Sequence, residues 1–525
     1  MFPERIHRVV FLIGTALLVI GLPVSYFLLS VSIILLSLNW VLEARFKRKW
    51  EIIRHRKAIL LILSIYFIHL IWFFNSSDLA YAIHDIRIKL PLLALPLIYG
   101  TAQPLSKKEF KIILQLFIGT VLVNSLITTF ILLGFTKLDP IDPRKASLFL
   151  SHIRFALMVV LSIYVLFYLL FFNEFSLTRF EKYSGMVWLA WLICFLVILQ
   201  SFTGIVVFLI LCPVAIVWLA HYRKKHSGII SAYLSCTIIL IAVAGYIILS
   251  INRYSRVNEP ENTILESHTV NGAPYLHAEN RDEYENGYKI WNYISIDELK
   301  KEWNKRSDFN FDSLDRKGQL LKITLIRYMT SMGLRKDSMG ISQLDPEDIH
   351  MVEKGYTNHI YRHKFAIYPR IYVLLWEIDQ YRKTGDPSGQ SLGQRIEYLK
   401  VGINIIKRHF WLGTGTGDVQ QEFYKQYELD KSLLKPEWRR KTHNQLITFF
   451  IAFGVFGFLW ILFALIAPAF YEKKYNDYLF MLFFLLSILS MLNEDTLETH
   501  PGVSLFAFFY SFFLFVAPVN KSPKA

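Results

Sequence analysis

The residues best suited to chemistry lie in one stretch of the chain, from Arg395 to Phe470. Within it, His443 and Asn444 follow the basic run Arg439–Lys441 and stand directly before an apolar segment of helical length. A histidine can titrate near neutral pH, accept a proton from a hydroxyl group or hydrogen-bond a phosphate oxygen. The same residues would also make an ordinary helix start, with Asn444 or the preceding threonine as its cap. The residue types alone leave both interpretations open.

Arg395 is the second candidate, because a planar guanidinium suits phosphate oxygens and stays charged at any pH. A single arginine on an exposed helix is more often a solvated residue. Ile396, Leu399 and Ile403 recur at helical spacing after it. Residues 395–410 are therefore predicted to form an amphipathic helix, lying either at the membrane–water boundary or against its own domain.

The glycine-rich run Gly413-Thr-Gly-Thr-Gly-Asp418 follows that helix. Backbone N–H groups in such a run can cradle phosphate. This one lacks the Lys-Ser/Thr of a P-loop, and no strand precedes it as in a dinucleotide-binding fingerprint. A tight turn after the helix is the favoured interpretation.

Carboxylates gather in the sequence Asn493-Glu-Asp-Thr-Leu-Glu-Thr-His-Pro501, between two apolar segments. Carboxylates near membrane depth are unfavourable unless they face a polar cavity or a cation. Glu494 and Glu498 would share a helix face if the preceding helix continued that far. They could then orient a basic partner or activate a hydroxyl group. A plain exposed acidic loop is an equally good interpretation.

Further cations stand at the starts of apolar segments. Arg154 begins one, and Arg87 and Lys89 begin another. A charged residue at membrane depth is a functional-site hypothesis by default. Snorkelling of the long side chains toward lipid headgroups is the competing interpretation.

The elements that must position these groups are membrane spans. The chain has 525 residues, of which 54% are hydrophobic, and 42 of them are Phe. Its mean hydropathy is +0.35. These values exclude an ordinary soluble enzyme. The apolar blocks are of roughly 17–25 residues and do not alternate as β-barrel strands do. The three cysteines all lie inside such blocks, where they are predicted to be small buried hydrophobes.

Twelve spans are predicted, and an all-α polytopic membrane protein is the expected fold class. The spans fall at approximately 8–21, 24–42, 58–75, 86–102, 112–134, 153–172, 186–200, 204–220, 228–250, 444–470, 477–493 and 502–518.

Basic segments orient these spans. Residues 45–57, 107–108, 223–225 and 473–474 are rich in Lys and Arg and fall on one side, whereas the short loops 76–84 and 494–501 have neither. The basic side is predicted to face the cytoplasm, and both termini are predicted to lie on that side. The predicted organisation is then spans one to nine in residues 1–250, a large helical extracytoplasmic loop domain in 251–443, and spans ten to twelve in 444–525. All the candidate residues fall on the extracytoplasmic face, where they would suit an anionic, lipid-linked substrate.

These features together resemble the O-antigen ligase / O-antigen polymerase superfamily of bacterial inner-membrane glycosyltransferases. The resemblance rests on Arg395 with its helix and glycine turn, on His443-Asn444 leading into a span with Gly454 and Gly457, and on the span layout. The ending from Glu494 to Phe509 is similar to that of a Bacteroidetes-type branch. One position departs from the pattern, because Phe202 stands where the family commonly has an arginine that contacts the lipid diphosphate.

The resemblance implies a chemistry. A glycan on undecaprenyl diphosphate at the periplasmic face would be transferred to an acceptor hydroxyl, by a metal-independent protein of GT-C type without a cofactor. Arg395, with Arg154 or Arg440, would stabilise the diphosphate leaving group. His443 would activate the hydroxyl or bind diphosphate, with Glu494 or Glu498 as the rival base. Lys441, Asn444 and Arg87 are the remaining predicted substrate-binding residues, and no metal ligands are expected.

Several functions share this donor site. An O-antigen ligase would use lipid A core as the acceptor, a polymerase would use another lipid-linked repeat, and a protein O-oligosaccharyltransferase would use Ser or Thr. The expected partners are the lipid-linked donor, the acceptor and membrane lipids, not nucleic acid. A secondary transporter or an inactive scaffold is the alternative from a different class; a transporter would show charges near the midplane of broken spans, and these spans are nearly free of charge there.

Overall fold

The structure is a computed structural model that describes residues 3–135, 147–223, 226–258, 264–278, 281–363 and 366–518. Residues 1–2, 224–225 and 519–525 lie outside this range, and they include both predicted cytoplasmic termini and two of the predicted basic residues. The chain divides into two compact units, one formed by residues 1–237 with 377–525 and the other by residues 238–376. We call them the first and the second unit.

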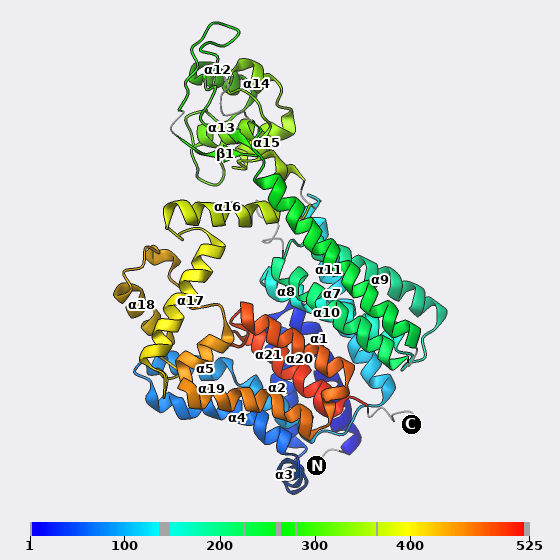
Figure 1. Cartoon of the computed structure of the whole chain (residues 1–525). Coiled ribbons are helices and arrows are strands. Elements are labelled where there is room, and N and C mark those ends of the chain that lie inside the picture. The colour runs from blue at the N-terminus through cyan, green and yellow to red at the C-terminus, as the bar shows by residue number, and fades with distance from the viewer. Residues whose placement is uncertain are drawn as a thin grey trace. The chain divides into compact units, whose positions relative to one another are not determined.

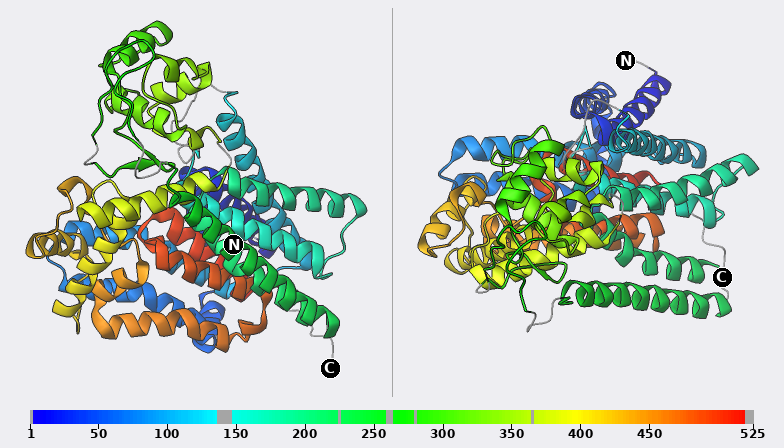
Figure 2. Two further views of the ribbon diagram at one scale, coloured as in Figure 1. Left: turned by 45° about the horizontal axis from the view of Figure 1, so that its top comes forward. Right: turned by 90° about the horizontal axis from the view of Figure 1, so that it is seen from above.

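The first unit is a helical bundle (Figures 1 and 2). Its elements are α1 (Glu4–Val24), α2 (Tyr26–Leu42), α3 (Phe46–His55), α4 (Lys57–Ile71), η1 (Trp72–Asn75), α5 (Leu79–Ile88), α6 (Pro91–Thr101), α7 (Lys107–Leu132), α8 (His152–Phe171), α9 (Arg179–Ile198), α10 (Phe202–Tyr222), α17 (Ser391–Arg408), α18 (Val419–Leu429), η4 (Pro436–Trp438), α19 (Gln445–Tyr471), η5 (Lys474–Asn476), α20 (Tyr478–Asn493), η6 (Thr496–Glu498), α21 (His500–Ser511) and η7 (Phe512–Val516).

The second unit is smaller and carries one two-stranded antiparallel ladder, so the described chain is not purely helical. Its elements are β1 (Tyr284–Glu285), β2 (Tyr288–Lys289), α12 (Ile296–Arg306), α13 (Leu321–Ser331), α14 (Ser338–Ser342), α15 (Pro346–Glu353) and η3 (His359–Arg362). Two helices, α11 (His226–Tyr254) and α16 (Tyr368–Thr384), run from one unit into the other. The core of the second unit contains the fully buried side chains of Trp303, Phe311 and Tyr328.

Helices occupy all twelve predicted spans, although the one at 86–102 is broken between α5 and α6. Among the described residues, eight helices are long and apolar enough to cross a membrane, and a ninth is possible if the bent pair α2–α3 is one span. The fold is thus that of a polytopic helical membrane protein, while the number twelve stays a prediction.

Polar caps start the apolar helices where the sequence changes from polar to apolar. Ser106 with Glu109, and Thr178 with Glu181, form capping boxes at the starts of α7 and α9. Each cap satisfies backbone N–H groups that a helix start otherwise leaves unpaired. Asn444 does the same for α19, with its side chain accepting from the Ile447 N–H.

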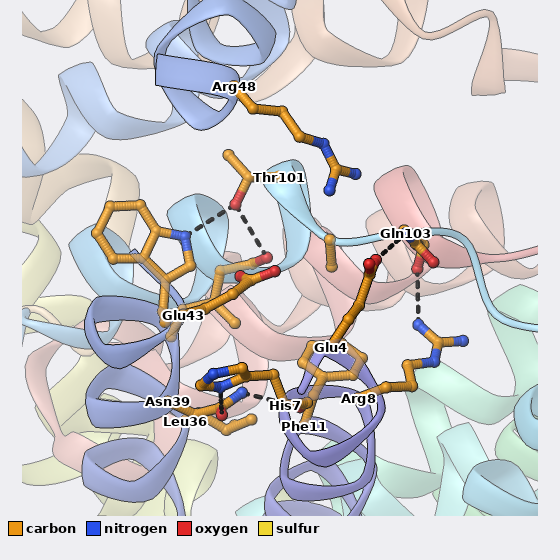
Figure 3. Close-up of a pocket in the computed structure, with 13 residues that line it drawn as sticks. Glu4, His7, Arg8, Phe11, Leu36, Asn39, Glu43, Arg48, Thr101 and Gln103 are labelled. Atoms are coloured by element: carbon orange, nitrogen blue, oxygen red, sulfur yellow. Dashed lines mark hydrogen bonds between the residues drawn. The ribbon is translucent and has the colours of Figure 1, made fainter. Parts of the chain in front are cut away.

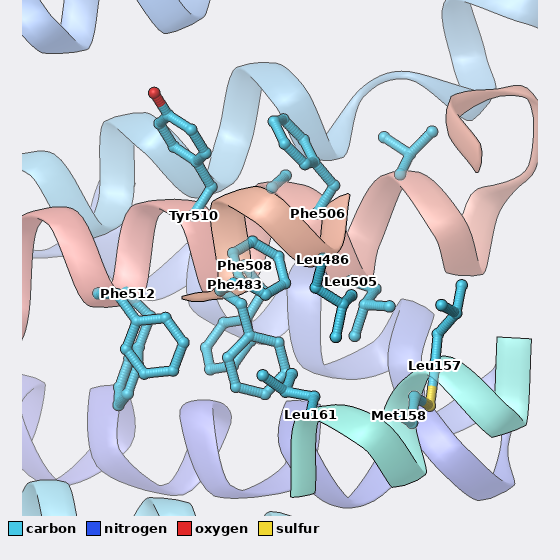
Figure 4. Packing of buried hydrophobic residues seen from close by; sticks show 14 of the residues in the cluster. Leu157, Met158, Leu161, Phe483, Leu486, Leu505, Phe506, Phe508, Tyr510 and Phe512 are labelled. Carbon is cyan, nitrogen blue, oxygen red and sulfur yellow. The ribbon is translucent and has the colours of Figure 1, made fainter. Parts of the chain in front are cut away.

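Phenylalanine fills the centre of the first unit. In Figure 4, Phe508 of α21 and Phe512 of η7 pack with Phe483 of α20 and Leu161 of α8. The Phe512 ring stacks on Phe110 of α7 with 5.1 Å between their centroids. Most residues in the apolar window of α8 are buried, whereas fewer than a third are buried in the windows of α9, α10 and α11. Such exposed apolar faces are what lipid contact requires.

The basic segments gather at one end of the first unit, which we call the basic end. Arg56 pairs with Glu472 after α19 at 2.8 Å, Arg8 with Glu109 at 2.8 Å, and Lys111 with Glu181 at 2.6 Å. Residues Asn444, Asn493 and His500 lie at the other ends of their helices, which we call the site end. The structure therefore brings the predicted basic side together, and the compartment it faces remains a prediction from the charge bias.

Candidate functional site

The turn after α20 is the centre of the candidate site. Helix α20 ends at Asn493, Glu494 is extended, and Thr496–Glu498 forms a single 3-10 turn. The condition under which Glu494 and Glu498 would share a helix face, continuation of the helix past Asn493, is therefore not met. Because the chain leaves the helix before Glu494, the two carboxylates are free to take different partners.

Glu498 forms the middle of a buried ionic network. Its Oε1 accepts from Lys89 Nζ at 3.2 Å and from Gln445 Nε2 at 3.1 Å, and its Oε2 accepts from Lys441 Nζ at 3.1 Å. Lys89 also pairs with Asp85, one turn earlier on α5. Three separate chain segments are joined in this way: the end of α5, the start of α19 and the turn before α21.

The network sets the protonation of its members. Burial alone would raise the pKa of Glu498, but the ammonium groups of Lys89 and Lys441 lower it well below the usual value. Burial likewise opposes the ammonium form of Lys441, yet the Glu498 carboxylate raises the pKa of Lys441 above its usual value. Both side chains are therefore charged at neutral pH and hold each other in place.

His443 lies beside this network with a free edge. Its backbone takes a φ of 51°, in the left-handed region. Its Nδ1 is 4.0 Å from Asp495 Oδ2, its ring is 5.8 Å from that of Tyr398, and its side chain is 35% exposed. Burial, with the positive charges of Arg395, Arg440 and Lys441, lowers the pKa of His443 to about 4. The imidazole is thus neutral at pH 7 and able to accept a proton.

Asp495, which is not among the predicted site residues, lies next to His443. Its Oδ1 accepts from Thr448 Oγ1 at 2.8 Å. Burial raises the pKa of Asp495 to about 6, and the Glu498 carboxylate acts in the same direction. Asp495 is therefore mostly ionised at pH 7 and can stabilise a positive charge on the imidazole.

Arg395 reaches the same turn from α17. Its Nη1 donates to Asn493 Oδ1 at 2.5 Å, and its Nη2 is 3.7 Å from Glu494 Oε1. Asn493 in turn donates through Nδ2 to Thr203 Oγ1 at 2.6 Å. The side chain of Arg395 is 36% exposed, so a ligand has access to part of it.

Glu494 faces two arginines. Burial raises the pKa of Glu494 to about 7, although the guanidinium groups of Arg395 and Arg154 act in the opposite direction. Arg154 stands on the first turn of α8. Phe202, next to Thr203 at the start of α10, is about half exposed at this same end. Phe202, which stands where the resemblance leads us to expect an arginine, is therefore next to a residue that Asn493 contacts. Arg154 supplies a cation that acts on Glu494.

Three predicted site residues are not part of the clustered contacts. Arg87 is exposed and contacts His84 on its own helix at 3.3 Å. Lys89, and not Arg87, pairs with Glu498 in the ionic network. Arg440 is exposed, and its carbonyl accepts from Tyr427. The Asn444 side chain caps α19 and donates to the Leu492 carbonyl at 2.9 Å, which confirms the capping interpretation.

The glycine-rich run is a docking turn and not a phosphate cradle. The N–H groups of Thr414 and Gly415 donate to carbonyls of α19, at Ile451 and Ala452, over 2.8 and 2.9 Å. The Gly417 N–H donates to Ser76 Oγ at 2.9 Å. These donors are already used by the protein, so the tight-turn interpretation is confirmed and the turn fixes α17 and α18 to the bundle.

Helix α19 is built to receive that turn. Gly454, in its middle, has φ 61° and ψ −171°, which breaks the helix where the run docks. A Cβ on Gly454 would lie 2.3 Å from the Trp411 carbonyl oxygen. Only glycine fits both the backbone angles and this approach.

Two cavities lie in the first unit. One, of about 10 Å³, is lined by Lys89, Lys441 and Glu498 together with His69 and Phe453, and has room for about one water molecule. The other lies at the basic end, where Figure 3 shows Glu4, His7 and Arg8 facing Asn39, Glu43 and Gln103. Its polar groups are largely joined to one another, as in the 2.9 Å contact between His7 Nδ1 and Asn39 Oδ1. None of the predicted site residues lines this second cavity.

The predicted site residues include none of Asp495, Asn493 and Lys89, although the sequence shows Lys89 among the cations and Asp495 among the carboxylates near the spans. Asp495 stands between the two carboxylates that were chosen, and nothing in its type distinguishes it from them. Lys89 carried a usable signal, since a lysine between two apolar segments needs a buried partner. In the described ranges, no three His, Cys, Asp or Glu side chains are grouped closely enough to hold a metal ion.

Comparison with known proteins bears on the stretch that holds this site. A search of curated proteins returned no match. Residues 354–462 match the family model described as O-antigen ligase, and they include Arg395, the glycine turn and His443. With the apolar helices, this match supports a multi-pass membrane protein with a ligase- or polymerase-type, glycosyltransferase-like function. The resemblance of the chain to the O-antigen ligase superfamily is thereby confirmed.

Proposed function

We propose that the protein is a glycosyltransferase of the bacterial inner membrane. It transfers a glycan from undecaprenyl diphosphate to an acceptor hydroxyl at the periplasmic face, as an O-antigen ligase with lipid A core as the acceptor. The observation that carries the proposal is the convergence of two arginines and a neutral histidine on one carboxylate-rich turn, inside the stretch that resembles O-antigen ligases. A GT-C-type architecture is part of the same proposal.

The donor diphosphate binds to Arg395 and Arg154. Glu494 occupies this place in the unliganded site, and its pKa of about 7 makes its charge easy to remove near neutral pH. Once it is protonated, both guanidinium groups are available to phosphate oxygens. The exposed Arg440 and the network residue Lys441 add positive charge nearby. These cations can stabilise a diphosphate leaving group, so we propose a metal-independent reaction.

His443 is the proposed base. The acceptor O–H gives its proton to the imidazole, the hydroxyl oxygen bonds to the anomeric carbon, and the bond from that carbon to the diphosphate breaks. The electron pair of that bond leaves with undecaprenyl diphosphate. Asp495, 4.0 Å away, stabilises the imidazolium that forms. Binding of the anionic donor also offsets the cations that depress the pKa of His443, so the base becomes stronger when substrate is present.

The two rival bases differ in their suitability. Glu498 is held ionised between Lys89 and Lys441, and a depressed pKa makes it a poor proton acceptor. We assign it to positioning, since it fixes Lys441 and the start of α19. Glu494, with its raised pKa, remains the alternative base to His443.

The test is transfer in proteoliposomes that contain an undecaprenyl-diphosphate glycan and one of three acceptors: lipid A core, a second lipid-linked repeat or a Ser/Thr peptide. His443→Ala and Arg395→Ala should each lower kcat/KM by about 10²–10⁴-fold, the range of a lost acid–base or charge-stabilising group. Controls are Lys400→Ala, an exposed cation on the same helix α17, and His221→Ala at the basic end. EDTA should leave the rate unchanged.

Each outcome is informative. Transfer to lipid A core supports the ligase, and transfer only to the repeat or only to the peptide moves the assignment to a polymerase or a protein glycosyltransferase. Wild-type rates in both site variants would sink the site assignment. A wild-type protein that transfers glycan to none of the acceptors contradicts the enzyme and favours an inactive scaffold, in keeping with Phe202.

A further inference from the structure

A polar cavity in the second unit has no part in the site described above. Its volume is about 420 Å³, within the usual range of small-molecule sites. Among its lining residues are Arg253, Arg256, Asn286, Tyr288, His359 and Tyr368. They come from the end of α11, the β-ladder, η3 and the start of α16, so the cavity is formed by the fold of the unit and not by one loop.

The floor of the cavity is a hydrogen-bonded cluster. His359 Nδ1 is 3.1 Å from Ser331 Oγ, and Asn286 Nδ2 donates to the Ser331 carbonyl at 2.8 Å and to Asn358 Oδ1 at 3.1 Å. Asn358 in turn donates to the buried carboxylate of Glu285 at 2.8 Å. Burial lowers the pKa of His359, so its ring is a neutral hydrogen-bonding group at pH 7. A floor held in this way is rigid and polar, which suits recognition of hydroxyl groups.

The rim of the cavity is positively charged. The Arg253 guanidinium lies over the Tyr368 ring, 4.1 Å from its centroid. Some arginines of the unit are paired with carboxylates, as Arg335 is with Glu266 and Arg362 is with Asp345. Within the described part of the chain, no Asp or Glu side chain pairs with Arg253 or Arg256, and none lines the cavity. Two guanidinium groups without a carboxylate partner among the described residues, beside a polar cavity, favour an anionic ligand.

The position of the cavity in the chain further limits the class of ligand. Arg253 is on the last turn of α11, whose apolar part, Tyr233–Tyr254, is a candidate membrane span. Arg256 follows directly after it. The two arginines thus lie at and directly after the end of a candidate membrane span. The cavity is also lined by amide and imidazole groups and by two tyrosines. These offer more hydrogen-bonding groups than a bare phosphate would use.

We propose that this cavity binds an anionic sugar, a pyranose that carries a carboxylate or a phosphate, because two uncompensated arginines meet a rigid amide, imidazole and tyrosine lining at the end of a membrane span. The guanidinium groups hold the anion, and Asn286 and His359 hydrogen-bond the hydroxyl groups. That this sugar belongs to the glycan donor or to the acceptor rests on the proposed function. Binding itself does not depend on transfer.

The experiment uses the full-length protein in phosphatidylcholine nanodiscs, with binding followed by saturation-transfer NMR and calorimetry. The probes are glucose 6-phosphate, glucuronate, glucose and inorganic phosphate. The two anionic sugars should bind at least about 10-fold more tightly than glucose or inorganic phosphate, as a charge-assisted hydrogen bond predicts. Arg256→Gln and Arg253→Gln should each weaken binding of the anionic sugars by about 10-fold. His359→Ala should weaken binding of glucose as well.

The matched control is Arg316→Gln. Arg316 also lies over an aromatic ring, that of Phe309, in the same unit but away from the cavity. The Arg316→Gln substitution should leave the affinities for all four probes unchanged. Thermal melts report whether each variant is folded. Unchanged binding in both Arg253 and Arg256 variants overturns the proposal, as does a wild type that binds no anionic sugar.

Two further results also overturn it. Inorganic phosphate that binds as tightly as glucose 6-phosphate would mean a simple anion site. Displacement of glucose 6-phosphate by phosphatidylglycerol added to the nanodiscs would mean a phospholipid headgroup site. A failed transfer assay with intact sugar binding, by contrast, counts against the proposed function and leaves this inference standing.

Discussion

Glu494 and Glu498 stand in one short turn, yet they have opposite electrostatic surroundings. Glu498 meets two ammonium groups within 3.2 Å, whereas Glu494 is partly buried, with the Arg395 guanidinium at 3.7 Å. The pKa of Glu498 is accordingly depressed and that of Glu494 is raised to about 7. Carboxylates of the same type thus divide into a permanent anion and a group that titrates near neutral pH.

The raised pKa of Glu494 predicts a pH dependence of donor binding. Below about pH 7 the carboxyl group is neutral and leaves Arg395 and Arg154 to the diphosphate, and above it the carboxylate competes for them. The donor KM should therefore rise between pH 6 and pH 8 in the wild type. Glu494→Gln should keep the low-pH KM across this range, as initial-rate measurements at each pH would show. A Glu494→Gln enzyme with the wild-type pH profile, or with no activity at any pH, would contradict this role.

The same shift affects stability. Because the folded-state pKa of Glu494 lies above the usual 4.5, its contribution to stability is fully present below pH 4.5 and is lost as the pH rises through about 7. The direction is opposite to that of an ordinary ion-paired glutamate.

Glu498 gives a separate stability prediction. Glu498→Gln leaves Lys89 and Lys441 buried without their shared carboxylate, and breaking a buried ion pair from one side costs about 3–5 kcal/mol. The melting temperature of the purified protein should fall clearly. Glu428→Gln is the control, since Glu428 is mostly exposed in its pair with Arg439 and such pairs contribute about 0–1 kcal/mol. Equal melting temperatures for the two variants would refute the network as a structural element.

At the scale of elements, the break in α19 positions the site. The glycine turn docks into this break and fixes α17, which carries Arg395, against the helix that begins at Asn444. Ile396, Leu399 and Ile403 are exposed on α17, and Trp411 beside the turn is exposed as well. This apolar stripe is compatible with a helix at the membrane boundary, which remains a prediction.

Gly454→Ala tests the docking. The substitution forces an unfavourable backbone conformation, worth about 1–3 kcal/mol, and places a Cβ against the Trp411 carbonyl. We expect a lower melting temperature together with a loss of transfer, because Arg395 is displaced. Gly119→Ala, in the middle of α7 with no atom within 4 Å of the added Cβ, should be neutral or slightly stabilising. If Gly454→Ala matches Gly119→Ala in both measurements, the break does not position the site.

At the scale of the whole molecule, charge separates the two ends of the first unit. The basic segments and their carboxylate partners gather at one end, and the predicted site residues gather at the other. The positive-inside tendency predicts that the basic end faces the cytoplasm and the site end the opposite side of the membrane.

Cysteine labelling in intact cells checks this orientation. In a background with the three native cysteines replaced by alanine, Glu437→Cys at the site end should react with a membrane-impermeant maleimide. Lys47→Cys at the basic end should react only after the inner membrane is opened; both positions are exposed. The reverse labelling pattern would invert the topology and remove the periplasmic substrate from the proposal.

The local features of this protein could be predicted from its amino-acid sequence. Apolar blocks gave the helices, polar caps gave their starts, as at Asn444, and the glycine run gave a turn, because each depends on residues within a few positions. The same local evidence singled out Arg395, His443 and the 494–498 turn. The match to O-antigen ligases over residues 354–462 confirms the resemblance drawn from these motifs.

Only the tertiary structure decided which groups meet. Arg87 and Lys89 are two residues apart, about 200° around a helix, so one is exposed and the other is buried against Glu498. Asp495, and not Glu494 or Glu498, lies next to His443 because α20 ends at Asn493 and the turn then reverses its direction. Such pairings depend on how distant helix ends pack, and no periodicity in the sequence records that packing.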